Sequence, residues 1–201
     1  MKFIGKIVIV CMCLAVVLWF AMVIADRHTL SNDIIRLHVV GASDSEEDQQ
    51  VKLQVRDAVL GVLESVQVED VGDAKVSLEA LFPQLEQAAN GALQDAGMPH
   101  KATVSLAREA FPTREYETFS LPAGVYESLR VTIGEGEGKN WWCVVFPSLC
   151  LPATSAEFED TSVGAGFSDT LTDTLQQEQG YELRFFFLDC LGWLQNLFHR
   201  T

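Results

Sequence analysis

One uncharged run near the N-terminus constrains this chain more than any other feature. From Ile7 to Ala25 it reads IVIVCMCLAVVLWFAMVIA, 19 residues without a charged side chain. As a helix rising about 1.5 Å per residue, this run would reach roughly 28 Å, close to the ~30 Å hydrocarbon core of a bilayer. Lys2 and Lys6 precede it, and the positive-inside tendency then keeps the N-terminus in the cytosol. We therefore expect residues 26–201 to be exported.

Two interpretations of residues 1–25 stay open, a signal peptide and a single-pass transmembrane anchor. Val23-Ile24-Ala25 resembles the small-x-Ala pattern of a signal-peptidase site, with cleavage before Asp26. The apolar run is nevertheless long for a signal peptide, and Asp26 with Arg27 forms a weak stop. A buried core helix is disfavoured, because 19 uncharged residues stand at the very N-terminus.

The remainder of the chain is strongly acidic. The formal net charge of −14 includes Lys2 and Lys6; residues 26–201 carry 12 basic and 28 acidic side chains, a net of −16. Nucleic-acid phosphates need a basic surface, so this balance argues against DNA or RNA binding. Twelve Phe and four Trp are enough to build one globular core.

Hydrophobic periodicity after residue 30 predicts one α+β domain. The segment Ile34–Val40 alternates as a strand, with Ile35, Leu37 and Val39 on one face and Arg36 and His38 on the other. Apolar stripes at helical spacing predict two helices, the first capped within residues 43–45. We expect an α+β domain over 30–152, with two helices packed on a mainly antiparallel sheet. The helices are expected at about 45–66 and 73–96, and further strands at 102–107, 114–121, 125–133 and 141–146.

The C-terminal part divides into two segments. Residues 153–180 are poor in large apolar side chains and rich in Thr, Ser, Asp, Glu and Gly, so we expect an acidic insert of low order. Residues 181–201 return to apolar patterning, which predicts a strand at Glu182–Leu188 followed by a short amphipathic helix.

No motif for catalysis or metal binding is present in the sequence. None of the four histidines belongs to a His-Glu-x-x-His or similar pattern, and no Gly-x-Ser-x-Gly elbow occurs. Arg36 and His38 share a strand face that could meet a carboxylate, although a solvent-facing pair explains them equally well. The cysteine spacing is not that of a zinc site. We therefore predict a protein that is not an enzyme and needs no cofactor.

The positions of the cysteines and tryptophans suggest a disulfide and two oppositely oriented indole rings. A turn at Pro147 would bring Cys143 and Cys150 opposite each other, and an exported location permits a disulfide. Two buried free thiols remain the alternative. Trp141 and Trp142 are adjacent, so in a strand they point to opposite faces. One enters the core, while the other needs a second layer or a partner.

Residues 35–60, residues 126–150 and the N-terminal apolar segment together resemble stage II sporulation protein R of endospore-forming bacteria. The two internal motifs read IRLHVVGASDSEEDQQVKLQVRDAVL and YESLRVTIGEGEGKNWWCVVFPSLC. Two positions depart from the family pattern: Ala42 replaces the usual Asn, and Ser148 stands where a second Pro is common. Ser43 or Asp44 must therefore cap the first helix here.

The resemblance implies a signalling protein, exported from the forespore into the space between the forespore and mother-cell membranes. There it would activate the membrane-embedded aspartic peptidase that processes the sigma-E precursor. The candidate partner-binding residues are Arg36, His38, Asp44, Arg56 and Trp142. A cell-wall hydrolase is the alternative, which requires His38, Asp44 and Asp48 to converge in a cleft. A membrane-anchored structural module is a third possibility.

Overall fold

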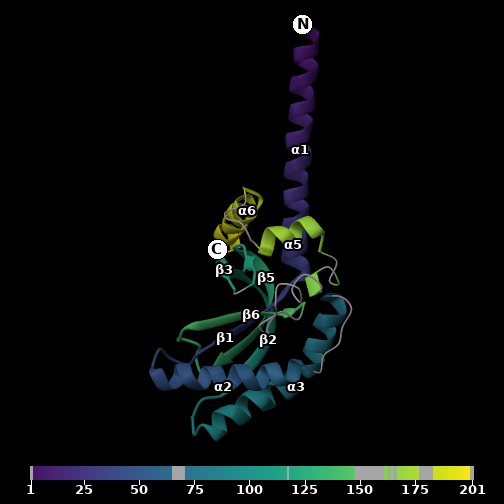
Figure 1. Cartoon of the computed structure of the whole chain (residues 1–201). Helices are drawn as coiled ribbons and strands as arrows, with labels where there is room; N and C mark the ends of the chain where they lie inside the picture. Colours follow the sequence, from purple (N-terminus) through teal and green to yellow (C-terminus); the bar gives the residue numbers. More distant parts are fainter. Residues whose placement is uncertain are drawn as a thin grey trace.

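A four-stranded mixed sheet forms the centre of the computed structural model (Figure 1), in the order β2-β5-β1-β6. The structure describes residues 2–64, 71–116, 118–147, 161–162, 164, 167–176 and 183–199. Strand β1 pairs parallel with β5 and antiparallel with β6, and β2 pairs antiparallel with β5. The predicted α+β class with a mainly antiparallel sheet is confirmed. The strands span Ile35–Val40 (β1), Ala102–Phe111 (β2), Gly124–Ile133 (β5) and Asn140–Phe146 (β6).

Two helices cover one face of this sheet, as the apolar stripes predicted. They are α2 (Glu46–Leu63) and α3 (Val71–Asp95), with Pro83 inside α3. Ser45 caps α2 by accepting a hydrogen bond from the backbone N–H of Asp48. The apolar face of β1 packs beneath these helices, and its three side chains Ile35, Leu37 and Val39 are fully buried there.

The other face of the sheet carries a second layer that the sequence did not predict. It consists of the end of α1 (Lys2–Asp33) together with α5 (Asp169–Gln176) and α6 (Leu183–His199). Figure 1 shows α5 and α6 beside the C-terminal part of α1, while the N-terminal length of α1 projects alone. A second buried cluster fills this layer. Its members include Val23, Leu30, Ile34, Phe111, Tyr126, Phe185 and Leu188.

The expected strand at Glu182–Leu188 is wrong, because Leu183–His199 forms helix α6. Phe185 and Leu188 are buried while Phe186 is exposed, which is helical spacing. Three consecutive phenylalanines hide this period in the sequence. The expected strand over 114–121 is also replaced, by two short paired strands, β3 (Arg114–Glu115) and β4 (Ser120–Leu121).

The low order expected for residues 153–180 does not hold at Asp169–Gln176, which forms helix α5. This helix buries Leu171 and Leu175 in the second cluster, so two leucines four residues apart suffice to fix a short amphipathic helix. Residues 153–160, 163, 165–166 and 177–180 lie outside the described part of the chain.

Helix α1 is long and apolar enough to cross a membrane, with a mean hydropathy of 3.1 in its most apolar window. Both ends of the predicted apolar segment, Ile7 and Ala25, lie within it and are exposed. The helix does not end at Ala25 but continues through Asp33, where it meets the sheet.

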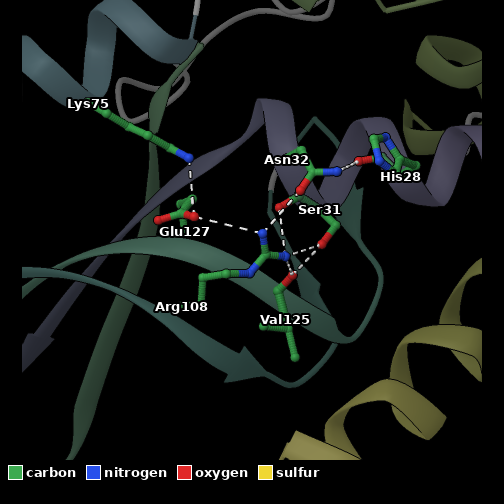
Figure 2. A network of polar contacts seen from close by, with 7 residues as sticks. All are labelled: His28, Ser31, Asn32, Lys75, Arg108, Val125 and Glu127. Carbon is green, nitrogen blue, oxygen red and sulfur yellow. Dashed lines mark hydrogen bonds and ion pairs between the residues drawn. The ribbon is translucent and has the colours of Figure 1, made fainter.

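Polar contacts fasten this last turn of α1 to the sheet (Figure 2). Arg108 on β2 donates to the side chains of Ser31 and Asn32, at 2.7 Å and 3.0 Å. It also reaches the Val125 carbonyl at 3.4 Å and lies 3.7 Å from Glu127, which in turn pairs with Lys75 of α3 at 3.1 Å. The apolar helix and the folded domain are thus joined without a flexible linker.

Candidate functional site

The second face of β1 holds a fully buried arginine. Arg36 is the largest side chain in the described structure that is completely enclosed. Its guanidinium carbon lies 4.2 Å from the ring centroid of Phe111 and 5.3 Å from that of Tyr126. One nitrogen donates to the Tyr116 hydroxyl at 2.9 Å. Within the described residues, Nε and Nη1 of Arg36 have no hydrogen-bond partner. A buried cation held mainly by rings is costly, so packing alone does not account for arginine here.

Next to Arg36 along the strand, His38 belongs to a buried charge network. Its Nδ1 lies 3.0 Å from a Glu109 carboxylate oxygen, and the other Glu109 oxygen accepts from Arg130 at 2.8 Å. Burial acts to raise the pKa of Glu109, but the His38 hydrogen bond and the positive charges of His38 and Arg130 prevail and lower it to about 2. Glu109 therefore stays ionised and orients the imidazole.

Trp142 closes this cluster on the side of β6. The His38 and Trp142 ring centroids are 5.8 Å apart, and the Arg114 guanidinium carbon lies 4.0 Å from the Trp142 ring. Trp141 points to the opposite face, where the Arg56 guanidinium carbon lies 4.9 Å from its ring. The prediction that the two tryptophans face opposite ways is confirmed.

Trp142 also lines a groove of about 640 Å³ between the sheet and α6. The sheet side is built from the ends of β2 and β6, and the helix side from one face of α6. Its aromatic and apolar lining with a few polar groups is typical of a binding site. The lining residues that matter here are Phe111, Thr113, Asn140, Trp142, Trp193 and Leu197.

The predicted partner-binding residues do not form one surface. Arg36, His38 and Trp142 lie together on the second face of the sheet. Asp44 is exposed at the start of α2, where it accepts a hydrogen bond from the Lys139 backbone N–H at 2.8 Å. Arg56 lies on α2, across the sheet from Arg36, and pairs with Asp57 at 2.6 Å. Of the two interpretations of Arg36 and His38, the solvent-facing pair is wrong, because the second layer buries both, and His38 meets the Glu109 carboxylate instead.

The residues that a hydrolase would need do not converge. His38 pairs with Glu109, whereas Asp48 contacts Ser43 and lies 3.4 Å from His100. Asp44 makes its contact with Lys139 instead. Within the described ranges, no group of three or more His, Cys, Asp and Glu side chains could hold a metal ion.

Cys143 is buried and disulfide-bonded, whereas Cys11, Cys13 and Cys190 are free thiols. Cys150 lies outside the described residues, so the predicted pairing of Cys143 with Cys150 stays a prediction.

Sequence reasoning missed Glu109, Arg130, Phe111 and Tyr116, which complete the cluster. The register of the sheet brings Arg130 and Glu109 there, since β5 places Arg130 beside His38 of β1 and Tyr126 beside Glu109 of β2. The predicted strand at 102–107 stopped short of Glu109. The alternation of polar and apolar residues breaks at Ala107 and Arg108, so it did not indicate that the strand continues to Phe111.

Residues 31–156 match the model of the family described as stage II sporulation protein R. The chain belongs to this family. A curated relative, stage II sporulation protein R of Bacillus subtilis (strain 168), is 28% identical over 189 residues, covering 84% of this chain and 83% of the relative. No solved structure matches the chain. The matched range contains the whole sheet and all five candidate partner-binding residues, so the family and its sporulation role attach to this domain.

Proposed function

We propose that the exported domain is an intercellular sporulation signal that activates the membrane-embedded sigma-E processing peptidase. Activation then leads to cleavage of the sigma-E precursor. The observation that carries this proposal is the family match over residues 31–156. In this role the protein is a ligand of the peptidase, and the domain works in the space between the forespore and mother-cell membranes.

Two structural features support such a role. The membrane-length helix α1 continues directly into the folded domain, so the domain is held close to a bilayer. The groove lined by Trp142 opens beside α6, which contacts the same helix. The domain would thus present this groove in the space between the two membranes. We propose the groove as the contact surface, because Trp142 is only partly buried there and tryptophan is a favoured anchor at interfaces.

Arg36 and His38 would then affect the groove indirectly, through the aromatic residues that line it. Arg36 and His38 cannot touch a partner, but both pack on Phe111, which lines the groove. His38 also packs on Trp142. We propose that these two residues position the aromatic wall, and that Trp142 makes the contact.

The test is co-expression of the full chain with the peptidase and the sigma-E precursor in a host that does not sporulate. We expect precursor cleavage only when all three proteins are present and the domain is exported. Absence of cleavage despite confirmed export would overturn the proposal. Cleavage without the peptidase would instead indicate an enzymatic activity of the chain itself.

Single substitutions then locate the surface. Trp142→Ala should lower cleavage, while Val76→Ala, at an exposed apolar position on the far face, should not. Export and folding of both variants are checked by fractionation and urea unfolding. Normal signalling by a folded Trp142→Ala variant would show that the contact surface lies elsewhere.

A further inference from the structure

Helix α6 exposes large apolar side chains on its outward side in addition to those it buries against the domain. Large apolar side chains point away from the domain, including Trp193, Leu194 and Leu197, which are 60%, 44% and 52% exposed. Phe186 and Phe198 are also exposed. Monomeric soluble proteins rarely leave such a continuous apolar patch in water.

The polar side chains described on α6 all bond to α1 or to the sheet side, although Gln195 is itself exposed. Arg184 donates to Asp26 at 2.8 Å, and Gln195 accepts from Arg27 at 2.8 Å, both on α1. Two more polar residues bond to the sheet side: Asp189 accepts from the Ala123 backbone N–H at 2.7 Å, and Asn196 donates to the Phe111 carbonyl at 2.8 Å. These four are the strongly polar side chains that the structure describes on α6.

Helix α5, in the same layer, has the ordinary arrangement. Asp169, Thr170 and Asp173 are exposed, while Leu171 and Leu175 are buried. The exposed apolar face therefore belongs to α6 and not to the layer as a whole. It points to an apolar environment on one side of α6 alone.

The position of α6 against α1 identifies that environment. The Phe187 ring lies 5.2 Å from Trp19 and 5.3 Å from Phe20. Trp19 precedes Ala25, the end of the uncharged run, by six residues, or about 9 Å along a helix axis. Phe187 is thus placed at a depth where α1 is still fully apolar.

Helix α6 also crosses α1 instead of running along it. Arg184, near the start of α6, and Gln195, near its end, bond to the consecutive residues Asp26 and Arg27. Both ends of α6 therefore lie at the level where the apolar run of α1 ends, so α6 is oriented roughly along the plane of a bilayer that α1 spans. Figure 1 shows α6 beside this part of α1.

We propose that α6 is an interfacial membrane helix, seated in the leaflet next to the exported domain, with Trp193, Leu194 and Leu197 among the lipid acyl chains. The occupant of the apolar face is lipid. Trp193 and Leu197 also border the groove, so the proposed peptidase contact falls on the sheet side of the groove, at Trp142. The patch continues the apolar surface of α1 through Phe187, Trp19 and Phe20. This proposal does not depend on the proposed signalling role.

The charges on and around α6 indicate that its contact with lipid is apolar and not electrostatic. Arg184 and Asp189 are both engaged with the domain, and the exported part carries a net charge of −16. Attraction to anionic headgroups therefore does not drive the contact, unlike in basic amphipathic helices. Insertion should be equal in phosphatidylcholine and in mixed phosphatidylcholine–phosphatidylglycerol vesicles, and unchanged by about 0.5 M salt.

The test uses the full chain reconstituted into phosphatidylcholine vesicles with or without brominated acyl chains, which quench tryptophan fluorescence on contact. Subtracting the emission of Trp193→Phe from that of the unmodified chain isolates Trp193 from the other three tryptophans. We expect brominated lipid to quench the Trp193 emission at least about two-fold, as insertion into the acyl region requires. Acrylamide in the aqueous phase should have little effect.

Two variants complete the test. Leu194→Gln combined with Leu197→Gln should reduce the quenching of Trp193, while Val76→Gln, a matched change on α3, should not. The altered positions are exposed, so urea unfolding should be nearly unchanged. Trp193 emission that brominated lipid leaves intact and acrylamide quenches would overturn the proposal. Trp193 could instead be protected from acrylamide only when the chain dimerises, or only when a membrane protein is added. Either result would assign the apolar face of α6 to that occupant and would also overturn the proposal.

Discussion

At the scale of single residues, substitutions of Arg36 should show whether its charge contributes to the stability of the fold or to signalling. Its charge is buried between rings with one neutral hydrogen bond, so an apolar side chain of similar length should replace it at little cost. We expect Arg36→Met to unfold with a free energy within about 1 kcal/mol of the unmodified chain or above it. Arg36→Ala should lose about 2–4 kcal/mol, because it leaves a cavity. Urea unfolding measures both.

The two arginine variants check each other. If Arg36→Met loses as much stability as Arg36→Ala, the guanidinium itself holds the fold together and our interpretation of the site is wrong. If Arg36→Met is stable but fails to support sigma-E precursor cleavage, arginine is present for the signalling surface.

Glu109 gives a pH dependence with a defined sign. Its pKa is lowered from 4.5 to about 2 in the folded chain, so the unfolded state binds more protons between these values. The contribution of Glu109 to stability is complete above about pH 5 and is lost as the pH falls toward 2, by up to about 3 kcal/mol. Glu109→Gln should flatten the profile of unfolding free energy across this range. Glu115→Gln, at an exposed carboxylate on β3, should leave the profile unchanged.

The same residues show what sequence can predict about a site. Alternation in β1 placed Arg36 and His38 on one face and Ile35, Leu37 and Val39 on the other, and this is confirmed. Their partners could not be predicted, because His38 meets Glu109 across 71 positions of chain. Only the pairing of β1, β5 and β2 determines that contact.

At the scale of elements, the docking of α6 depends on a glycine. A Cβ atom at Gly192 would lie 1.5 Å from the carbonyl oxygen of Ala123, in the turn before β5. Gly192→Ala should therefore push α6 away from the domain, with a loss of about 2 kcal/mol or more. Gly91→Ala in α3 has nothing within 4 Å of the added carbon and should stabilise by about 0.5–1 kcal/mol.

Thermal unfolding and hydrogen exchange of residues 183–199 measure these two changes. Faster exchange confined to α6 in Gly192→Ala is the expected pattern. Equal stability of the two glycine variants would contradict the close approach of α6 to the Ala123 carbonyl.

Elements with one apolar face were predictable, and so was the helix after Leu188, but the first turns of α6 were not. Helices α2 and α3 each bury one apolar face, and the central strands β1, β5 and β6 carry strand patterning even though both faces of β1 are buried, so periodicity located all five to within a few residues. In α6 the apolar side chains cover both the inward and the outward side, so the helical period disappears into a continuous apolar pattern. A bilayer on one side explains why the usual rule fails for this helix.

At the scale of the whole molecule, the apolar head and the acidic domain form one continuous body. Val23 is fully buried in the second cluster, and Trp19 and Phe20 cover Phe187. Cleavage after Ala25 would remove all three side chains and leave Phe187 uncovered. The signal-peptide and anchor interpretations of the sequence therefore differ in their consequences for the fold.

We expect the exported chain to keep α1 uncleaved. Val23, the third residue before the bond that would be cleaved, is fully buried in the second cluster, so the folded chain shields this site. The intact mass of the unmodified chain should therefore be that of all 201 residues. Ala25→Leu, at an exposed position, should change nothing beyond the substitution itself, because no cleavage is there to block. Val23→Ala creates an Ala-x-Ala site and should yield a chain that begins at Asp26.

Mass spectrometry and N-terminal sequencing of membrane and soluble fractions measure these outcomes. An unmodified chain that begins at Asp26 would show that α1 is a signal peptide. The cleaved Val23→Ala product also tests the proposed membrane contact of α6. If α6 lies in the bilayer, part of this product stays with the membrane fraction although α1 has been removed. Adding Leu194→Gln and Leu197→Gln to that variant should then release it, because no apolar face would remain to hold the domain at the membrane.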